Sequence, residues 1–400
     1  MKNYLLLIFL LIIWVNLQAQ NDEKKRVTQE FELELSVETT YYPTEGQFTS
    51  QHSFFPSFAV TPEYALSWNN GYESLKFKGF FRLDLDKKRT HWDIRELYYQ
   101  KAQNNWELNI GLKKVFWGVT ESTHLVDIIN QTDQVESFDG EEKLGQPMAN
   151  FTLTSDRFGA FDFYYLPYHR KRVFAGEKGR LRFGTVIDGT DIDYENSNEE
   201  WQPSFAFRWS HYFGIVDIGI TQYYGAGREP LFTFNPDGDF SIFYPIIYQS
   251  GLDLQITSGA FLWKIESIYR YADLQDFFAS AVGLEYTFSN LNGKGLDIGV
   301  LTEFLYDSRD ELTLSSADND LFYGSRIAFN GVNDTAVLIG GLTDIKTGSS
   351  ILSLEASRRI GDSWTINIET RLFTYVDNRE IILPNFKDDS FIKIKASKYF

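Results

Sequence analysis

Apolar and polar residues alternate one by one along much of this chain. The segment Phe31–Glu38 (FELELSVE) carries apolar side chains at odd positions and polar ones at even positions. The same alternation returns in residues 75–78, 81–85, 364–369 and 392–396. Because neighbouring side chains of a strand point to opposite faces of a sheet, this period of two predicts strands with one apolar and one polar face.

The predicted strands are long, and their connections alternate in length. The strands run about 10–13 residues, whereas a tilted strand needs about 9–11 to cross a bilayer and a typical globular strand has about 5–6. Tight turns rich in Gly, Asn and Asp alternate with longer stretches at 116–146, 170–200, 227–244, 307–319 and 376–388. This pattern predicts an all-β fold: a closed antiparallel transmembrane β-barrel of about 18 strands, with 16 as the alternative, short periplasmic turns and longer external loops.

The first residues predict export. Met1 and Lys2 precede an apolar run from Tyr4 to Val15, and Ala19 supplies the small residue expected before a cleavage site. This is the pattern of a secretory signal peptide, so we expect residues 1–19 to be removed and residues 20–400 to form a single barrel domain. An uncleaved N-terminal anchor is the alternative, but the apolar run is short for a membrane span.

The composition is polar on average yet rich in aromatic residues. Phe, Tyr and Trp make up 17% of the chain, and the mean hydropathy is -0.29. The net charge of -17 argues against nucleic-acid binding, and the absence of Cys excludes disulfides and cysteine nucleophiles. Many aromatic residues fall near predicted strand ends, where a membrane barrel carries its two aromatic girdles: Tyr41, Tyr42, Trp68, Tyr98, Tyr99, Phe116, Trp117, Tyr223, Tyr224, Phe277, Phe278, Tyr306, Phe322, Tyr323 and Tyr375.

The C-terminal segment ends in Lys398-Tyr399-Phe400. With the export signal and the tyrosine-rich alternating strands, this end resembles Gram-negative outer-membrane β-barrels of the porin class, although Lys398 departs from their apolar pattern. The resemblance implies an outer-membrane location beside lipid and lipopolysaccharide, recognition of Tyr399 and Phe400 by the barrel-assembly machinery, and a possible homotrimer. The stretch from Phe116 through Met148 is also similar to a loop of poorly characterised porin-like barrels.

If the apolar positions face lipid, the charged positions between them must face the lumen. A charge on the lipid-facing surface costs about 2–4 kcal/mol near the membrane midplane. This argument gives the candidate lumen residues Glu32, Glu34, Lys76, Lys78, Arg82, Arg208, Lys264, Glu266, Arg270, Arg326, Glu355, Arg359, Glu369, Arg371, Lys393 and Lys395. Such residues could line a water-filled pore, or pair across neighbouring strands and brace a narrow or plugged barrel.

The stretch 116–146 is the candidate constriction. Between residues 122 and 135, four apolar residues are spaced for one face of a short helix: Leu125, Val126, Ile128 and Ile129. Such a helix must bury that face, either inside the barrel or over its rim. The constriction candidates in this stretch are Trp117, Asp127, Asn130 and Asp133.

Two other segments concentrate charge. Residues 169–182 form a basic cluster that could bind lipopolysaccharide phosphates or attract anionic solutes, although a solvated loop balanced by nearby acids is the simpler interpretation. Asp188, Asp191 and Asp193 offer the oxygen ligands that Ca²⁺ prefers, but they lack the spacing of an EF-hand loop. We therefore expect no metal and no cofactor.

These features favour a porin-like channel for the passive diffusion of small hydrophilic solutes. No Gly-x-Ser-x-Gly or His-Glu-x-x-His motif is present, and a wide barrel favours a channel over an enzyme. Two alternatives stay open. One is a non-conducting surface barrel that acts as an anchor or binds a polysaccharide or partner protein. The other is a lateral-opening transporter for hydrophobic substrates, which predicts a blocked lumen and an apolar pocket near the long loops.

Overall fold

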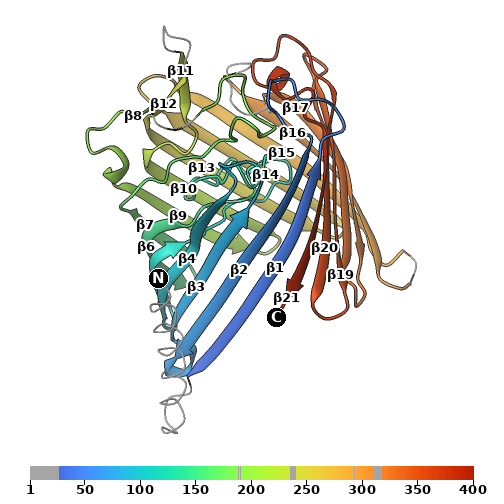
Figure 1. Cartoon of the computed structure of the whole chain (residues 1–400). Coiled ribbons are helices and arrows are strands. Elements are labelled where there is room, and N and C mark those ends of the chain that lie inside the picture. The colour runs from blue at the N-terminus through green and yellow to red at the C-terminus, as the bar shows by residue number, and fades with distance from the viewer. Residues whose placement is uncertain (1–26, 188, 190, 235–239, 292, 310–317) are drawn as a thin grey trace, which may run out of the picture.

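Eighteen antiparallel strands close into one barrel in the computed structural model, which describes residues 27–187, 189, 191–234, 240–291, 293–309 and 318–400. Each barrel strand pairs with the next one along the chain, and β1 (Thr28–Tyr41) closes the ring by pairing with β21 (Phe391–Tyr399) (Figure 1). The predicted fold class and the count of 18 strands are confirmed. The predicted signal peptide lies outside the described residues.

The remaining barrel strands follow in chain order: β2 (Phe54–Trp68), β3 (Glu73–Leu83), β4 (His91–Ala102), β5 (Trp106–Lys113), β6 (Gln146–Ser155), β7 (Gly159–Leu166), β9 (Ser204–Phe213), β10 (Val216–Ala226), β13 (Ile246–Ser258), β14 (Phe261–Tyr271), β15 (Phe277–Phe288), β16 (Leu296–Asp307), β17 (Asn319–Phe329), β18 (Thr335–Asp344), β19 (Ser350–Ile360) and β20 (Trp364–Tyr375). A small separate sheet joins β8 (Ile192–Tyr194), β11 (Leu231–Phe234) and β12 (Phe240–Tyr244).

Short and long connections lie at opposite rims of the barrel. The tight turns 69–72, 103–105, 156–158 and 214–215 share one rim with both ends of the barrel sequence, because the strand number is even. The long connections 114–145, 167–203, 227–245, 308–318 and 376–390 share the other rim. This asymmetry matches short periplasmic turns and longer external loops.

The strand faces differ as the alternation predicts. On β14, Trp263 and Tyr269 are exposed on the outer face, whereas Lys264 and Glu266 are buried on the inner face. On β16, Val300 and Phe304 are exposed and Glu303 is buried. An outer face of exposed apolar side chains is suited to contact the hydrocarbon chains of lipid.

The exposed aromatic side chains gather in two belts. At the rim of the long loops they are Tyr41, Phe54, Tyr165, Phe205, Tyr248, Tyr271, Phe278, Tyr306, Tyr323 and Tyr375; at the rim of the short turns they are Tyr212, Phe213, Phe261, Trp263, Phe288, Phe329, Trp364 and Phe400. Several predicted girdle residues lie instead in the interior, namely Tyr42, Tyr98, Trp117, Tyr223, Phe277 and Phe322. Adjacent aromatic residues in a strand must take opposite faces, so only one of each pair reaches the lipid.

Among the described residues, helix is limited to three 3-10 turns, η1 (Asn69–Gly71), η2 (Glu199–Trp201) and η4 (Leu383–Asn385). None of the helices found there is long and apolar enough to cross a membrane.

Candidate functional site: the loop inside the barrel and the cavity beside it

The connection between β5 and β6, residues 114–145, runs within the barrel (Figure 1). We call this segment the inner loop. It consists of turns, bends and one isolated bridge between Thr132 and Lys143. The helix predicted over residues 122–135 is therefore wrong. One reason lies in the hydrogen bonds of the inner loop, because the backbone N–H groups of Ser122 and Val126 donate to Glu303 and Glu266 of the barrel wall and not to helical carbonyls.

Glu266 on β14 receives four hydrogen bonds from the inner loop. Its Oε1 accepts the backbone N–H groups of Val119 at 2.7 Å and Thr120 at 3.0 Å, and also the Thr120 hydroxyl at 2.7 Å. Its Oε2 accepts the N–H of Val126 at 3.2 Å. Glu266 is fully buried. A buried carboxylate is tolerated only when its oxygens are hydrogen-bonded in this way, so Glu266 and the inner loop depend on each other.

Glu303 on β16 holds the next two residues of the inner loop. The N–H of Glu121 donates to Oε1 at 2.7 Å, and the N–H and hydroxyl of Ser122 donate to Oε2 at 2.8 and 2.5 Å. Glu303 is 1% exposed. Two carboxylates from two wall strands therefore clamp the segment 119–122.

The apolar residues of the inner loop pack in two directions. Val126, Ile128 and Ile129 join Trp117 in a buried cluster with inward side chains of β6, β7, β9, β10 and β13–β15. Leu125 also contacts a second cluster around Leu301 and Phe322 on β16 and β17. The helix-like spacing at 125, 126, 128 and 129 thus reflects a loop that packs on two parts of the wall.

Ion pairs fix the far half of the inner loop to the wall. Arg95 on β4 binds Asp133 at 2.5 Å, Arg82 on β3 binds Glu136 at 2.8 Å, and Arg371 on β20 binds Asp139 at 2.6 Å. Asp133 and Glu136 are nearly buried, and so are the guanidinium groups that bind them. Removing one partner of such a buried pair leaves an uncompensated charge, which costs several kcal/mol, about 3–5.

Two polar residues brace the base of the inner loop. Asn130 accepts the N–H of Val115 at 2.9 Å and donates to the carbonyls of Lys113 at 3.0 Å and Leu144 at 2.8 Å. Asp127 lies 3.4 Å from the ammonium of Lys143. Burial raises the pKa of the Asp127 carboxyl, and the charge of Lys143 opposes this. Both residues join the two arms of the inner loop.

His124 lies between two glutamates. Its Nε2 is 3.2 Å from Glu141, and its Nδ1 is 3.9 Å from Glu266. Burial lowers the pKa of His124, but the two carboxylates outweigh burial and raise it to about 10. The ring of His124 is therefore protonated at neutral pH. Gly118 makes this approach possible, because a Cβ there would lie 2.8 Å from Nδ1 of His124.

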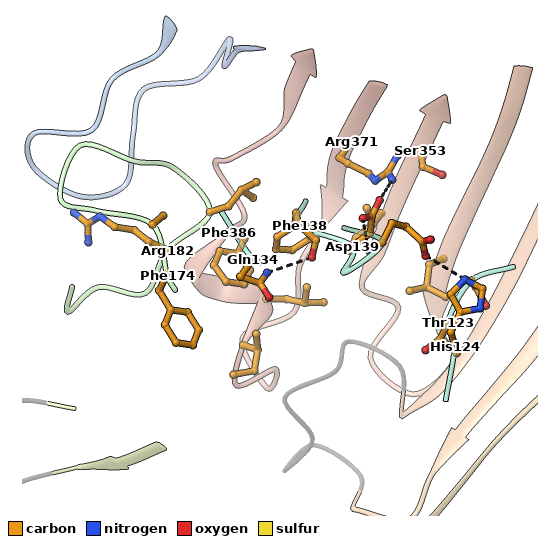
Figure 2. A pocket seen from close by; sticks show the side chains of 18 of the residues that line it. Thr123, His124, Gln134, Phe138, Asp139, Phe174, Arg182, Ser353, Arg371 and Phe386 are labelled. Carbon is orange, nitrogen blue, oxygen red and sulfur yellow. Dashed lines mark hydrogen bonds and ion pairs between the residues drawn. The ribbon is translucent and has the colours of Figure 1, made fainter. Parts of the chain in front are cut away.

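A cavity of about 470 Å³ lies between the inner loop and the wall formed by β17–β20. External segments 172–187, Phe232 and 382–386 line its outer part. Figure 2 shows Asp139 directed toward Arg371, with Phe138 and Gln134 beside Asp139. His124 lies at one end of the lining drawn there, and Phe174 and Arg182 lie at the opposite end. The apolar residues of the inner loop thus pack mainly along β6–β15, its acidic residues reach β3, β4 and β20, and the cavity lies between it and β17–β20.

The predicted lumen residues divide into three groups. Wall residues that pair with wall residues are Arg208 with Asp253, Lys78 with Glu63, Glu369 with Lys393 and Glu34 with Lys395. A second group binds the connections between strands: Arg82, Glu266 and Arg371 bind the inner loop, Arg326 and Lys264 bind Glu121 of the same loop, and Arg270 binds Glu229. Glu355 also belongs here, because it pairs with Arg371. Glu32 and Arg359 are exposed, and Lys76 is exposed near the ring of Tyr98.

The basic cluster 169–182 turns inward, contrary to the interpretation as a solvated loop. Arg180 is buried on Asp389 at 2.6 Å, Arg170 binds Asp93 at 2.8 Å, and Arg182 is also buried. Arg170 binds a carboxylate of β4 and Arg180 one of the connection 376–390, so these two residues fasten the segment 169–182 to the barrel and to another connection. Lys171 and Lys178 are the exposed cations of the cluster.

Among the calcium candidates, Asp188 lies outside the described residues, and Asp191 and Asp193 lie at β8. Within the described part of the chain, no group of three metal-ligating side chains comes together.

At the C-terminus, Phe400 exchanges two backbone hydrogen bonds with Leu33 of β1 and is 65% exposed. Its recognition by the assembly machinery, like that of Tyr399, stays a prediction.

Sequence reasoning missed Arg95, Glu136 and Arg228. Arg95 and Glu136 hold the inner loop, and Arg228 donates from Nε to the carbonyls of Ile128 and Ile129 at 3.2 and 3.1 Å. The alternation around β4 carried a signal for Arg95, because Asp93 and Arg95 share one face of that strand. Arg228 and Glu136 sit in connections, where no periodicity indicates a direction.

No protein-family model and no curated protein match this chain. Solved structures of similar fold include mutants of the Rh. blastica porin, one with 9% identity, a TM-score of 0.46 and coverage of 93% of this chain and 100% of that one. OmpT of Vibrio cholerae is similar at 10% identity and a TM-score of 0.43, over 94% of this chain and 98% of that one. These likenesses concern the barrel and carry no argument about function. Its own strand pairing and apolar exterior make the described chain a closed antiparallel β-barrel of 18 strands whose outer face suits lipid.

Proposed function

We propose that this chain is an outer-membrane channel through which small hydrophilic solutes diffuse passively, past the inner loop. The observation that carries the proposal is the cavity of about 470 Å³ between the inner loop and β17–β20. A loop made only to plug the lumen would have no need to leave such a space beside it. Charged side chains such as Arg371 and Glu355 line part of the space and would keep it hydrated.

The fixed position of the inner loop supports a constriction of constant width. Two wall carboxylates and three ion pairs hold it to five different strands. A constriction held this firmly would select solutes by size and charge without an energy source, and no catalytic step is part of the proposal.

Stepwise current in planar bilayers tests the proposal. Purified, refolded barrel should insert and give discrete conductance steps in salt solution. Absence of steps from protein whose folded state is shown by heat-modifiable electrophoretic mobility would reject the channel and favour a non-conducting surface barrel. A homotrimer remains a prediction, and chemical cross-linking in detergent tests it.

A further inference from the structure

The lumen wall beside the cavity is apolar where other wall strands are charged. From Ala336 to Leu342 the inward residues of β18 are uncharged: Ala336, Leu338, Gly340 and Leu342. The inward charge of this strand is Asp344 at its last position, where it accepts the N–H groups of Lys346 and Thr347 in the following turn. Leu338, Leu342, Phe322 of β17 and Ile351 of β19 all line the cavity. On β14, by contrast, the inward positions include Lys264, Glu266 and Arg270. A water-filled pore for uniformly polar solutes gains nothing from this apolar stripe.

Aromatic rings extend the apolar lining on the inner loop and external loops. Phe138 of the inner loop packs against Phe386 at 5.4 Å between ring centroids, and Phe183 lies 5.7 Å from the same ring. Phe174 and Phe232 form another contact at 5.6 Å. All five rings line the cavity. A molecule in this space would therefore meet apolar groups on more than one side.

Two cations of the cavity lining, Arg172 and Arg182, have no ion pair within the described residues. Arg182 donates to the carbonyls of Phe183 and Gly184, and the charges of Asp389, Glu177 and Asp86 act on it. Arg172 donates from Nε to the amide oxygen of Gln131 at 3.2 Å and from Nη2 to the carbonyl of Arg228 at 2.9 Å, and both acceptors are neutral. Within the described residues it makes no ion pair, whereas Arg371 in the same cavity binds both Asp139 and Glu355. Burial is the main cause that lowers the pKa of Arg172.

The surroundings of Arg172 add positive charge. Arg228 is buried, and its Nη1 and Nη2 have no hydrogen-bond partner. The nearby carboxylate of Glu229 is shared between Arg270 at 2.9 Å and Arg309 at 3.2 Å, so it does not neutralise Arg172 or Arg228. The other charged groups that line the cavity include Glu121, paired with Arg326 and Lys264, and Glu141, paired with His124. Arg172 thus borders the cavity with buried Arg228 nearby, and neither cation has an ion pair within the described residues.

We propose that the cavity is a binding site for amphipathic monoanions, compounds that join a carboxylate to an apolar ring or short chain. The carboxylate binds at Arg172, and the apolar body packs against Leu338, Leu342 and Ile351. This inference rests on the proposed channel function and sharpens its solute class, from hydrophilic solutes in general to water-soluble ones with an apolar part. A charge-assisted hydrogen bond together with the burial of several CH₂ groups gives selective binding.

Three probes separate the contribution of the negative charge from that of the apolar ring in the wild-type protein. Each is added to single channels in planar bilayers, where binding interrupts the current: 4-phenylbutyrate carries both features, butyrate lacks the ring, and 4-phenylbutylammonium has the opposite charge. We expect 4-phenylbutyrate to interrupt the current at about tenfold lower concentration than either of the others. Equal potency of butyrate or of the ammonium compound would overturn the proposal, while the stepwise current itself would leave the channel function standing.

Variants locate the site. Arg172→Gln should remove the preference for the anion over the ammonium compound, and Leu342→Asn should remove the preference for the ring. Arg157→Gln is the matched control, since Arg157 is an exposed cation in the short turn between β6 and β7. An unchanged preference in Arg172→Gln would reject the site. If the protein gives no current, calorimetric titration of the same probes into the detergent-solubilised barrel still decides whether the site exists: equal heats for all three would reject it.

Discussion

At the scale of single residues, two glutamates of the barrel wall determine where the inner loop lies. Glu266 and Glu303 are buried, yet between them they accept hydrogen bonds from five backbone N–H groups of residues 119–126. Each carboxylate replaces the water that would otherwise solvate these amides.

Replacing Glu303 by Gln should loosen the inner loop. Glu121 and Ser122 donate to different oxygens of Glu303, and the variant replaces one of these oxygens by an NH2 group. This NH2 group would face an N–H donor instead of accepting from it, and the loss is about 2 kcal/mol of anchoring. We expect larger current fluctuations in single-channel recordings at unchanged barrel stability. Glu34→Gln is the control, because Glu34 pairs with Lys395 and Ser397 of the neighbouring strand. Equal noise in both variants would show that Glu303 does not hold the inner loop.

His124 predicts a pH dependence. Its pKa of about 10 lies above the ordinary value of 6.5, so its protonated form stabilises the folded state. This contribution is complete below about pH 6.5 and is lost as the pH rises through 10. The current of the wild type should therefore become noisier between pH 7 and 10.5, whereas His124→Gln should be noisy throughout. If the difference in current noise between wild type and variant were the same at pH 7 and at pH 10.5, this prediction would be contradicted.

At the scale of elements, the inner loop is an ordered segment without regular secondary structure. The sequence indicated its place and length, because a long stretch between two predicted strands carried clustered apolar residues. It did not indicate the conformation, since the partners that decide it, Glu266, Glu303, Arg95 and Arg228, come from distant parts of the chain. Spacing alone made Leu125 to Ile129 resemble a helix face, and tertiary hydrogen bonds override such a pattern.

Hydrogen exchange tests this description of the inner loop. The amides of Val119, Thr120, Glu121 and Ser122 should exchange about as slowly as strand amides, because each donates to a buried carboxylate. In Glu303→Gln, protection should fall at Glu121 and Ser122 and persist at Val119 and Thr120. Fast exchange of all four amides in the wild type would mean that the inner loop is not fixed to the wall.

At the scale of the whole molecule, alternation sufficed to predict the barrel. Period-two segments such as Phe31–Glu38 and residues 364–369 predicted strands, and the strand length and alternating loop lengths predicted a membrane barrel. Orientation of single side chains also followed for Lys264 and Glu266, since β14 is regular. What the pattern could not give is the asymmetry of the lumen, because the folding of a loop into one side of a barrel depends on contacts between segments far apart in sequence.

The absence of Cys allows the two faces of the wall to be labelled one residue at a time. A spin label at Val300→Cys should be accessible to lipid-dissolved oxygen, since Val300 is 52% exposed on the outer face. A label at Ser353→Cys should be accessible instead to a water-soluble nickel complex, since Ser353 lines the cavity. Oxygen accessibility at both sites, or nickel accessibility at both, would contradict the assignment of the faces.

The central claim is that the inner loop narrows an otherwise open lumen. Lys113 and Gln146 are cross-strand partners, so a short Gly-Ser linker in place of residues 116–143 can join β5 to β6 and keep their pairing. The direct measurement is the single-channel conductance of this variant beside the wild type, with a Gly-Ser replacement of residues 46–51 as control, since that segment does not line the cavity. We predict discrete steps from the wild type, steps at least about twice as large from the variant lacking the inner loop, and wild-type steps from the control. Equal steps with and without the inner loop, or no steps from any of the folded barrels, would contradict the account.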